Sequence, residues 1–395
     1  MSSNKRTGSS QPIPKPKAPV KSDRKPRRGS IFYPALALIA CLAAGSDFLE
    51  QRKSEPIRPS QALTTTRWLS DYLPSLRRTR GDSELYIFDS RKPGGTLLVL
   101  GGTHPNEPAG YMAALLMVEN LQVEQGRVVV IPRANASGFT ATEPQEAYPE
   151  TFEITSKRSG IRSFRVGSRF TNILDGWPDP VVYRHRPSGQ LLSGNETRNL
   201  NRAYPGRPNG TLTERIACAI TEVVKREQVD LVIDLHEAAP EYPVINAIVA
   251  HERAMDIAAM ATVDLQSEGL DFRLEPSPAN FHGLSHRELG DWTPAKCFLI
   301  ESAGALQGRI RAATNADLVT RSQDPCYHRA SQLGKLQIPF PAEGIPLEVR
   351  IGRQLEAIKV ICRIQLENDP EHAITFNRIP TYEELESHGI GFYLR

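Results

Sequence analysis

Four short, almost purely apolar runs limit most strongly how this chain can fold. They occupy residues 97–100, 128–131, 231–235 and 297–300, and only Asp234 is polar. Runs of this length and composition are typical of strands that are buried on both faces, as in a sheet covered by helices. We therefore expect these four segments to form the centre of one sheet.

Helical signals alternate with these runs. Pro108 stands where the first turn of a helix tolerates proline, and apolar residues with helical spacing follow it. Thr211 and Glu214 have the spacing of a capping box, which predicts a helix beginning there. Further helices are expected near 253–267 and 347–366. Strands that alternate with helices predict an α/β domain of three layers, α/β/α.

The organisation of the 395 residues follows from composition. Residues 1–30 are rich in Pro, Ser, Lys and Arg, a composition that predicts a disordered basic tail. A hydrophobic segment at 31–46 follows, then a linker at 47–82 with a short helix around 62–76. The main domain is expected over 83–395, with a polar insertion of loops or short strands at about 140–195.

The hydrophobic segment resembles an export signal or a signal anchor. Its charge-free run of 14 residues is shorter than the about 20 that span a membrane, and a basic flank precedes it. Cys41 ends a pattern similar to a bacterial lipobox, which would make it a lipidation site. A buried N-terminal helix of a soluble domain is the alternative. We expect a membrane-anchored or exported protein, with its main domain outside the cytoplasm.

The net charge of +3 does not indicate nucleic-acid binding. Nine of the 48 basic residues and one of the 45 acidic residues lie in 1–29, which leaves the rest of the chain at −5. A nucleic-acid partner would require basic surface on the folded part, so we expect none. The five cysteines contain no C-x-x-C pair; they allow one or two disulfides after export, or buried free thiols.

His104 and Glu107 follow the first apolar run directly, in the segment Gly-Gly-Thr-His-Pro-Asn-Glu. Residues three apart can face one point where a strand turns into a helix, and the glycines permit a tight turn. Imidazole nitrogens and carboxylate oxygens are ligands that catalytic zinc accepts. We therefore interpret both residues as zinc ligands.

His236 and Glu301 stand at the ends of two other apolar runs. His236 would be the third zinc ligand, leaving the fourth position to water, and Asp234 on the same face of the strand could orient its ring. A carboxylate after a buried strand is costly unless it is paired or used, so Glu301 is the candidate general base. A hydrogen-bonded histidine and a salt-bridged acid are the structural alternatives. The shared position at strand ends, where α/β sheets bind ligands, favours the functional interpretation.

A dense polar patch lies at 198–206, Arg-Asn-Leu-Asn-Arg-Ala-Tyr-Pro-Gly. Asn201 and Arg202 could bind a substrate carboxylate, the arginine by a bidentate contact. Arg198 could stabilise the oxyanion that forms when water attacks a carbonyl. An ordinary polar loop is the alternative.

The order of these motifs resembles the succinylglutamate desuccinylase and aspartoacylase family of the zinc carboxypeptidase superfamily. The resemblance covers roughly residues 95–305 and includes Leu212-Thr-Glu-Arg215 besides the motifs quoted above. It implies an α/β/α fold around a mixed, mostly parallel sheet and one zinc ion on His104, Glu107 and His236. It also implies Glu301 as general base and acid, and Asn201 with Arg202 as the carboxylate clamp.

The activity implied is hydrolysis of an amide bond in an N-acyl amino acid or at a peptide C-terminus, with a substrate that bears a free carboxylate. A metallocarboxypeptidase for exported or cell-wall-derived peptides and an anchored non-catalytic binding protein of the same fold are the alternatives. The family's oxyanion arginine lies further ahead of the Asn-Arg pair than Arg198, so Arg184 or Arg186 could serve instead. A substrate-closing tyrosine could be Tyr327, Tyr382 or Tyr393.

Overall fold

A computed structural model describes residues 29–395 except 51, 52, 54 and 142–146. All but the last two residues of the predicted basic tail lie outside this part. The chain divides into two compact units, Met1–Gln51 and Arg52–Arg395.

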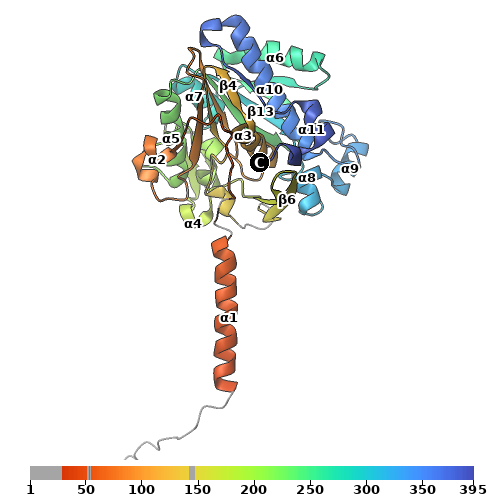
Figure 1. The fold of residues 1–395 in the computed structure, drawn as a ribbon. Helices are drawn as coiled ribbons and strands as arrows, with labels where there is room; N and C mark the ends of the chain where they lie inside the picture. Colours follow the sequence, from red (N-terminus) through yellow and green to blue (C-terminus); the bar gives the residue numbers. More distant parts are fainter. Residues whose placement is uncertain (1–28, 51–52, 54, 142–146) are drawn as a thin grey trace, which may run out of the picture. The chain divides into compact units, whose positions relative to one another are not determined.

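The N-terminal unit contains one described helix, α1 (Gly29–Glu50), drawn in red-orange in Figure 1. Its 22 residues extend over about 33 Å, close to the thickness of a bilayer's hydrocarbon core. Phe32–Glu50 has a mean hydropathy of 1.6 and is long and apolar enough to cross a membrane, a test that a signal sequence near the N-terminus also passes. The helix is longer than the predicted segment 31–46.

The second unit is built on an eight-stranded sheet with the order β1-β2-β5-β3-β10-β13-β11-β12. Its four central strands are parallel and are the four apolar runs of the sequence: β5 (Arg127–Ile131), β3 (Thr96–Leu100), β10 (Leu231–Ala238) and β13 (Lys296–Ala303). Antiparallel pairs at both edges make the sheet mixed. The four outer strands are β2 (Glu84–Asp89) and β1 (Thr65–Trp68) on one side, and β11 (Ala247–Ala250) and β12 (Arg273–Pro276) on the other.

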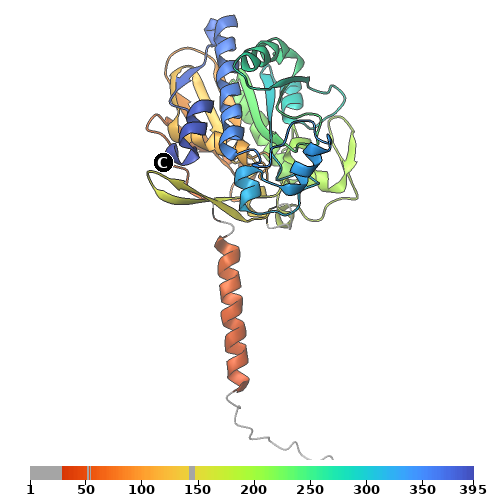
Figure 2. The same cartoon turned by 90° about the vertical axis from the view of Figure 1, so that its right-hand side faces the viewer.

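Helices cover both faces of this sheet (Figures 1 and 2). Alternate residues of β3 enter two separate cores: Leu97 and Val99 pack with one helical layer, Leu98 and Leu100 with the other. The first layer contains α3 (Pro108–Asn120), α6 (Met255–Ser267) and α10 (Leu347–Asn368), and the second contains α2 (Leu69–Tyr72), α5 (Leu212–Arg226) and α7 (Ser285–Trp292). The predicted three-layer α/β/α fold is confirmed.

The predicted helix starts are also confirmed. Thr211 caps α5, and Glu214 Oε2 accepts a hydrogen bond from the Thr211 amide at 2.9 Å, which completes the capping box. Pro108 opens α3. A Cβ atom at Gly110 would lie 2.3 Å from the carbonyl oxygen of Leu235, so glycine allows α3 to lie directly against β10.

Part of the predicted linker 47–82 forms regular structure that belongs to the sheet and its helices. Thr65–Trp68 form β1, which pairs with β2 in the register Thr65↔Ile87, and the helix expected around 62–76 is reduced to α2 and a 3-10 turn at Pro74–Leu76. All four side chains of β1 are exposed. An outer strand of this kind carries no apolar run, so its sequence gives no strand signal.

The insertion contains two hairpins, as loops or short strands were expected there. They are β6 (Thr151–Ser156) with β7 (Gly160–Arg165), and β8 (Val182–Arg184) with β9 (Leu191–Ser193), separated by the short α4 (Ile173–Gly176). The remaining elements are β4 (Gln122–Gln125), paired with β14 (Thr375–Asn377), and the helices α8 (Ala316–Arg321), α9 (Pro325–Gln332) and α11 (Tyr382–His388). All five cysteines are described, and each is a free thiol.

Candidate active site and metal centre

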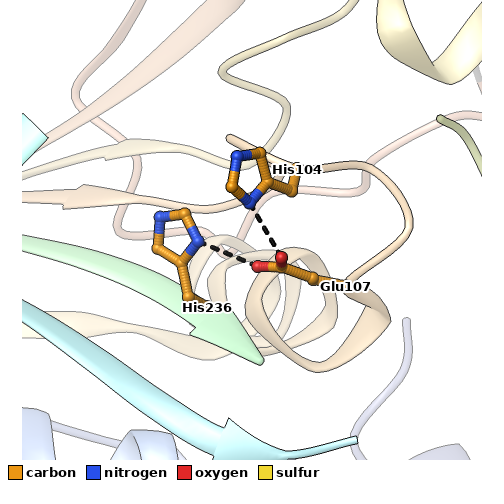
Figure 3. A group of neighbouring side chains, drawn as sticks. All are labelled: His104, Glu107 and His236. Atoms are coloured by element: carbon orange, nitrogen blue, oxygen red, sulfur yellow. Dashed lines mark hydrogen bonds and ion pairs between the residues drawn. The ribbon is translucent and has the colours of Figure 1, made fainter. Parts of the chain in front are cut away.

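Three predicted ligands meet in a buried cluster (Figure 3). Glu107 lies between the imidazoles: its Oε1 is 2.8 Å from His104 Nδ1, and its Oε2 is 2.8 Å from His236 Nδ1. The ligand atoms of the three residues all lie within 4.8 Å of one another. His104 reaches this point because the chain turns sharply after β3 at Gly102, whose φ is +64°.

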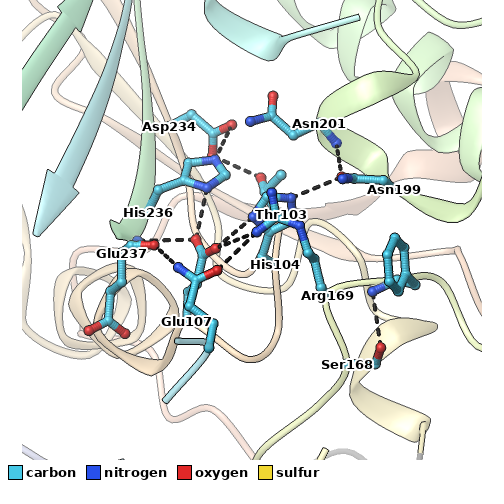
Figure 4. Close-up of polar contacts among 12 residues, drawn as sticks. Thr103, His104, Glu107, Ser168, Arg169, Asn199, Asn201, Asp234, His236 and Glu237 are labelled. Atoms are coloured by element: carbon cyan, nitrogen blue, oxygen red, sulfur yellow. Dashed lines mark hydrogen bonds and ion pairs between the residues drawn. The ribbon is translucent and has the colours of Figure 1, made fainter. Parts of the chain in front are cut away.

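The outer nitrogens of both imidazoles contact other polar groups (Figure 4). His236 Nε2 lies 3.0 Å from Asp234 Oδ2, and His104 Nε2 lies 2.9 Å from Asn199 Oδ1. A proton on each Nε2 would leave the Nδ1 lone pairs directed at Glu107, the arrangement of metal-bound histidines with outer-shell acceptors. The donor set of two imidazoles and one carboxylate fits zinc.

Positive charge beside Glu107 favours its ionised form. Burial opposes ionisation of Glu107, but His104 and His236 outweigh it and hold the pKa of the carboxyl well below its usual range. Burial lowers the pKa of His104 to about 4, and the charge of Arg169 adds to this effect. Burial also opposes the charged form of His236, but Asp234 and Glu107 raise its pKa above the usual value. A divalent cation would supply that charge instead of a proton.

Glu301 lies next to this cluster. In the parallel pair β10–β13 it stands opposite His236, and its Oε2 is buried without a hydrogen-bond partner among the described residues. Burial raises the pKa of Glu301 to about 8; His236 opposes this shift and Glu107 adds to it. An acid with a raised pKa beside a metal-ligand cluster can exchange a proton near neutral pH.

Asn201 and Arg202 form another wall of the same cavity, which has a volume of about 1320 Å³. Asn201 Oδ1 accepts a hydrogen bond of 2.8 Å from the Ser285 amide, so its NH₂ group is the one available to the cavity. The Arg202 guanidinium lies over the Phe281 ring at 4.9 Å, and burial lowers its pKa to about 10. Asn201 and Arg202 are therefore both held in one orientation, and the guanidinium of Arg202 carries a positive charge.

Arg198, predicted to stabilise an oxyanion, does not line the cavity. Its Nε and one terminal nitrogen contact the two Asp179 carboxylate oxygens at 2.8 and 3.1 Å, and the other terminal nitrogen donates to the carbonyl oxygen of Thr171 at 2.9 Å. Neither Arg184 nor Arg186 is among the residues that line this cavity. The acid that pairs with Arg198 lies 19 residues earlier, in the polar insertion.

A different arginine, Arg169, lies beside the cluster. Its terminal nitrogen lies 3.3 Å from Glu107 Oε1 and 3.0 Å from Gln307 Oε1, and it lines the cavity. No sequence pattern distinguishes Arg169, because the insertion contains many arginines without periodic spacing.

Two polar residues of α10 contact β10, the strand that carries His236, and neither was predicted from the sequence. Gln354 Nε2 donates to the carbonyl oxygen of His236 at 2.8 Å. Arg350, fully buried, contacts Glu237 Oε1 at 2.7 Å. The Glu237 amide in turn donates to Glu107 Oε2 at 3.1 Å. Arg350 and Gln354 are four apart and lie on the buried side of α10, among many other polar residues of this helix, so no sequence pattern distinguishes them.

The three candidate tyrosines do not contribute to the site. None of Tyr327, Tyr382 and Tyr393 is among the residues that line the cavity, whereas Tyr242 is. Tyr327 is buried, and its hydroxyl contacts Glu241 Oε2 at 2.7 Å.

Comparison with known proteins identifies related chains. Residues 93–320, more than half of the chain, match the succinylglutamate desuccinylase/aspartoacylase catalytic domain. The N-alpha-acetyl-L-2,4-diaminobutyric acid deacetylase of Halomonas elongata is 28% identical over 301 residues, which cover 69% of this chain and 71% of the relative.

Two solved structures have more distant similarity. The product-bound ectoine utilization protein EutE (DoeB) of Ruegeria pomeroyi aligns with a TM-score of 0.37 and 19% identity, over 60% of this chain and 56% of that one. The tripeptide-bound cell shape determinant Csd4 of Helicobacter pylori aligns with a TM-score of 0.45 and 13% identity, over 78% of this chain and 59% of that one. This chain thus covers less than two thirds of either structure.

The matched segment contains every residue of the candidate site, from His104 to Glu301. The family name and the curated relative's name both describe removal of an acyl group. The chain belongs to the succinylglutamate desuccinylase/aspartoacylase family, a family of deacylating hydrolases.

Proposed function

We propose that this protein is a zinc-dependent hydrolase that cleaves the amide bond of an N-acyl amino acid or of a peptide C-terminus. The observation that carries the proposal is the convergence of two imidazole Nδ1 atoms and one carboxylate beside an unpartnered glutamate, in one cavity. His104, Glu107 and His236 would hold one zinc ion per chain. Zinc at such a site lowers the pKa of a water ligand and polarises a carbonyl oxygen.

Glu301 is the proposed general base and acid. It lies beside His236 in the sheet, and its raised pKa favours holding a proton between two steps. It would accept a proton from the attacking water and pass it to the leaving nitrogen. A divalent cation in the cluster would lower the pKa of Glu301, which keeps it ionised before the attack.

Asn201 and Arg202 are the proposed clamp for the substrate carboxylate. Arg202 presents a cation to the cavity, and its stacking on Phe281 restricts its motion, which reduces the entropy lost on binding. We assign oxyanion stabilisation to Arg169 rather than to Arg198, because Arg169 lies against the metal-ligand cluster.

A carboxypeptidase acting on exported or cell-wall-derived peptides is the second candidate. The cavity of about 1320 Å³ exceeds the about 300–1,000 Å³ usual for small-ligand sites, which favours a substrate longer than one acyl amino acid. The apolar α1 supports a membrane-anchored or exported location for either enzyme. A non-catalytic binding protein would leave the unpartnered Glu301 without a role.

The test uses the full chain in detergent. Zinc is quantified, and hydrolysis is measured on N-acetyl amino acids and short peptides, each supplied with a free and with an amidated C-terminal carboxylate. We expect one zinc per chain and turnover only with the free carboxylate. A protein that binds no zinc, or that cleaves free and amidated substrates equally, would contradict the proposal.

A further inference from the structure

His286 has an unusual environment. It belongs to α7 and lines the cavity, its ring is 3% exposed, and neither ring nitrogen has a hydrogen-bond partner among the described residues. A buried polar atom without a partner is unfavourable, so such a side chain in a native fold calls for an explanation. The cavity is the direction from which a partner can come.

Three other buried or half-buried histidines illustrate the contrast. His185 contacts Ser188 Oγ and the carbonyl oxygen of Tyr204, and His282 contacts Glu288. His251 lies in an ion-pair cluster with Arg287 and Asp291. These side chains have partners that hold the fold, whereas no described residue hydrogen-bonds to His286.

The backbone places His286 beside the proposed carboxylate clamp. The amide of the preceding residue, Ser285, donates to Asn201 Oδ1, and its hydroxyl donates to Asp234 Oδ2 at 2.5 Å. A Cβ atom at Gly283 would lie 2.2 Å from the carbonyl oxygen of Arg202, so this loop packs tightly against the clamp. An amino acid whose carboxylate is bound by Asn201 and Arg202 would therefore place its side chain near His286.

Part of the cavity lining is apolar. Val249 and Leu299 stand opposite each other in the antiparallel pair β11–β13, and both line the cavity together with Leu284 and Pro278. An apolar wall with one unpartnered imidazole suits a side chain that has an aliphatic stem and a polar end. Burying such a stem is favourable, and the polar end satisfies the imidazole.

The charge of His286 limits which polar group a ligand side chain can carry at its end. Burial lowers the pKa of His286 to about 3, so the ring is neutral and offers one donor and one acceptor. Asp234 is the one acidic group among those that act on His286, whereas His236, Arg287 and His251 act in the opposite sense. The cavity lining contains Glu301 as well as Arg309 and Arg311. The neutral ring itself offers a negatively charged side chain a hydrogen bond but no counter-charge.

Resting on the proposed function, we propose that His286 recognises the side chain of the leaving amino acid, and that this side chain ends in a hydrogen-bonding group without negative charge. Amide, hydroxyl and amine ends fit this description. An aspartyl or glutamyl leaving group does not.

Binding of free amino acids tests the proposal without depending on turnover. Glutamine, 2,4-diaminobutyrate, norvaline and glutamate have aliphatic stems and different ends. Their affinities for the zinc-loaded full chain are measured by calorimetry. We expect glutamine or 2,4-diaminobutyrate to bind at least tenfold more tightly than norvaline, and glutamate to bind most weakly. Tightest binding of glutamate, or no binding of any of the four, would overturn the proposal.

Variants locate the interaction. His286→Phe keeps an aromatic ring without nitrogens, so it should reduce the preference over norvaline to less than threefold while norvaline binding is retained. His372→Phe at the exposed surface is the matched control. Val249→Phe should fill the pocket and abolish glutamine binding, while glycine still binds. An unchanged preference in His286→Phe and unchanged glutamine affinity in Val249→Phe would each contradict the assignment.

Failure of the proposed function gives a different result. If zinc and amino-acid selectivity are present but no N-acyl substrate is cleaved, the hydrolase proposal fails and the assignment of His286 stands. If substrates are cleaved and all lose rate equally in His286→Phe, the hydrolase proposal stands and the specificity role fails.

Discussion

His236 and Glu301 stand opposite each other on two parallel strands, so one residue of the metal-ligand cluster and the proposed base are held by the same backbone ladder. Their relative position is fixed by the hydrogen bonds between β10 and β13 rather than by flexible loops. Strands position functional groups more accurately than loops do, which favours this pair as the centre of the chemistry.

Glu301→Gln should separate zinc binding from turnover. The amide cannot accept a proton, so we expect kcat to fall by about 10²–10⁴-fold while zinc content stays at one per chain. Steady-state kinetics and metal analysis on the same sample measure both. Glu275→Gln on the outer strand β12 is the control. Full activity in Glu301→Gln would remove the base assignment.

Removal of the metal should destabilise the protein. A zinc ion that binds the folded cluster but not the unfolded chain, present at 100 times its Kd, would stabilise the fold by about 2.7 kcal/mol. We therefore expect a chelator to lower the Tm of the wild type but not of His104→Ala or His236→Ala. His372→Ala, whose ring pairs with Asp369 at the surface, should respond like the wild type. Chelator effects of equal size in all variants would exclude these ligands.

Arg169→Gln and Arg198→Gln should differ in their effects. Loss of an oxyanion donor costs about 10²–10³-fold in kcat, which we expect for Arg169→Gln. Arg198→Gln breaks the contacts with Asp179, so it should leave kcat within a few-fold and lower the free energy of unfolding by about 1–3 kcal/mol. Kinetics and urea unfolding of both variants measure this. The reverse pattern would restore Arg198 to the mechanism.

The buried ion pair below the cluster should be essential to stability. Arg350→Met leaves Glu237 without its counter-charge, and breaking a buried pair costs about 3–5 kcal/mol. We expect the double variant Glu237→Gln with Arg350→Met to recover part of this loss, measured by urea unfolding as a double-mutant cycle. Additive losses would show that the two side chains are not coupled.

His286 should make the fold sensitive to mild acid. Its pKa is lowered to about 3 in the folded protein, below the value of about 6.5 expected for the unfolded chain. Below pH 6.5 the unfolded chain therefore binds a proton that the folded protein excludes, and stability falls as the pH falls towards 3. At pH 5 the loss is roughly 2 kcal/mol relative to pH 7. Between pH 7 and pH 5 the free energy of unfolding of His286→Phe should fall by roughly 2 kcal/mol less than that of the wild type. Urea unfolding at both pH values measures this, and an identical decline in both proteins would contradict the burial of a neutral ring.

The sequence predicted the parts of the fold that have strong periodic or apolar signals. The four central strands, the cap at Thr211 and the helix after Pro108 were all predicted, because burial on both faces and capping leave local patterns. The strand Thr65–Trp68 was not, because its side chains are exposed and only pairing with β2 makes it a strand.

The site was predictable where its residues follow strands. The structure brings the predicted residues His104, His236 and Glu301 together, because strand ends meet at one edge of a sheet. No local pattern indicates that Arg169 and His286 line the same cavity, because their position depends on how the insertion and α7 fold back over that edge. The pairing of Arg198 with Asp179 leaves no local sequence pattern either, since the two residues meet only in the folded insertion.

The contacts of α10 have a consequence for where this protein can be shortened. The matched family segment ends at residue 320, whereas the guanidinium that neutralises Glu237 and the amide that binds the His236 carbonyl come from residues 350 and 354. A polypeptide ending at the family boundary would carry an uncompensated negative charge into its interior, next to the candidate metal ligands His236 and Glu107. In this chain, the shortest polypeptide that can fold independently is therefore longer than the segment 93–320 that matches the family.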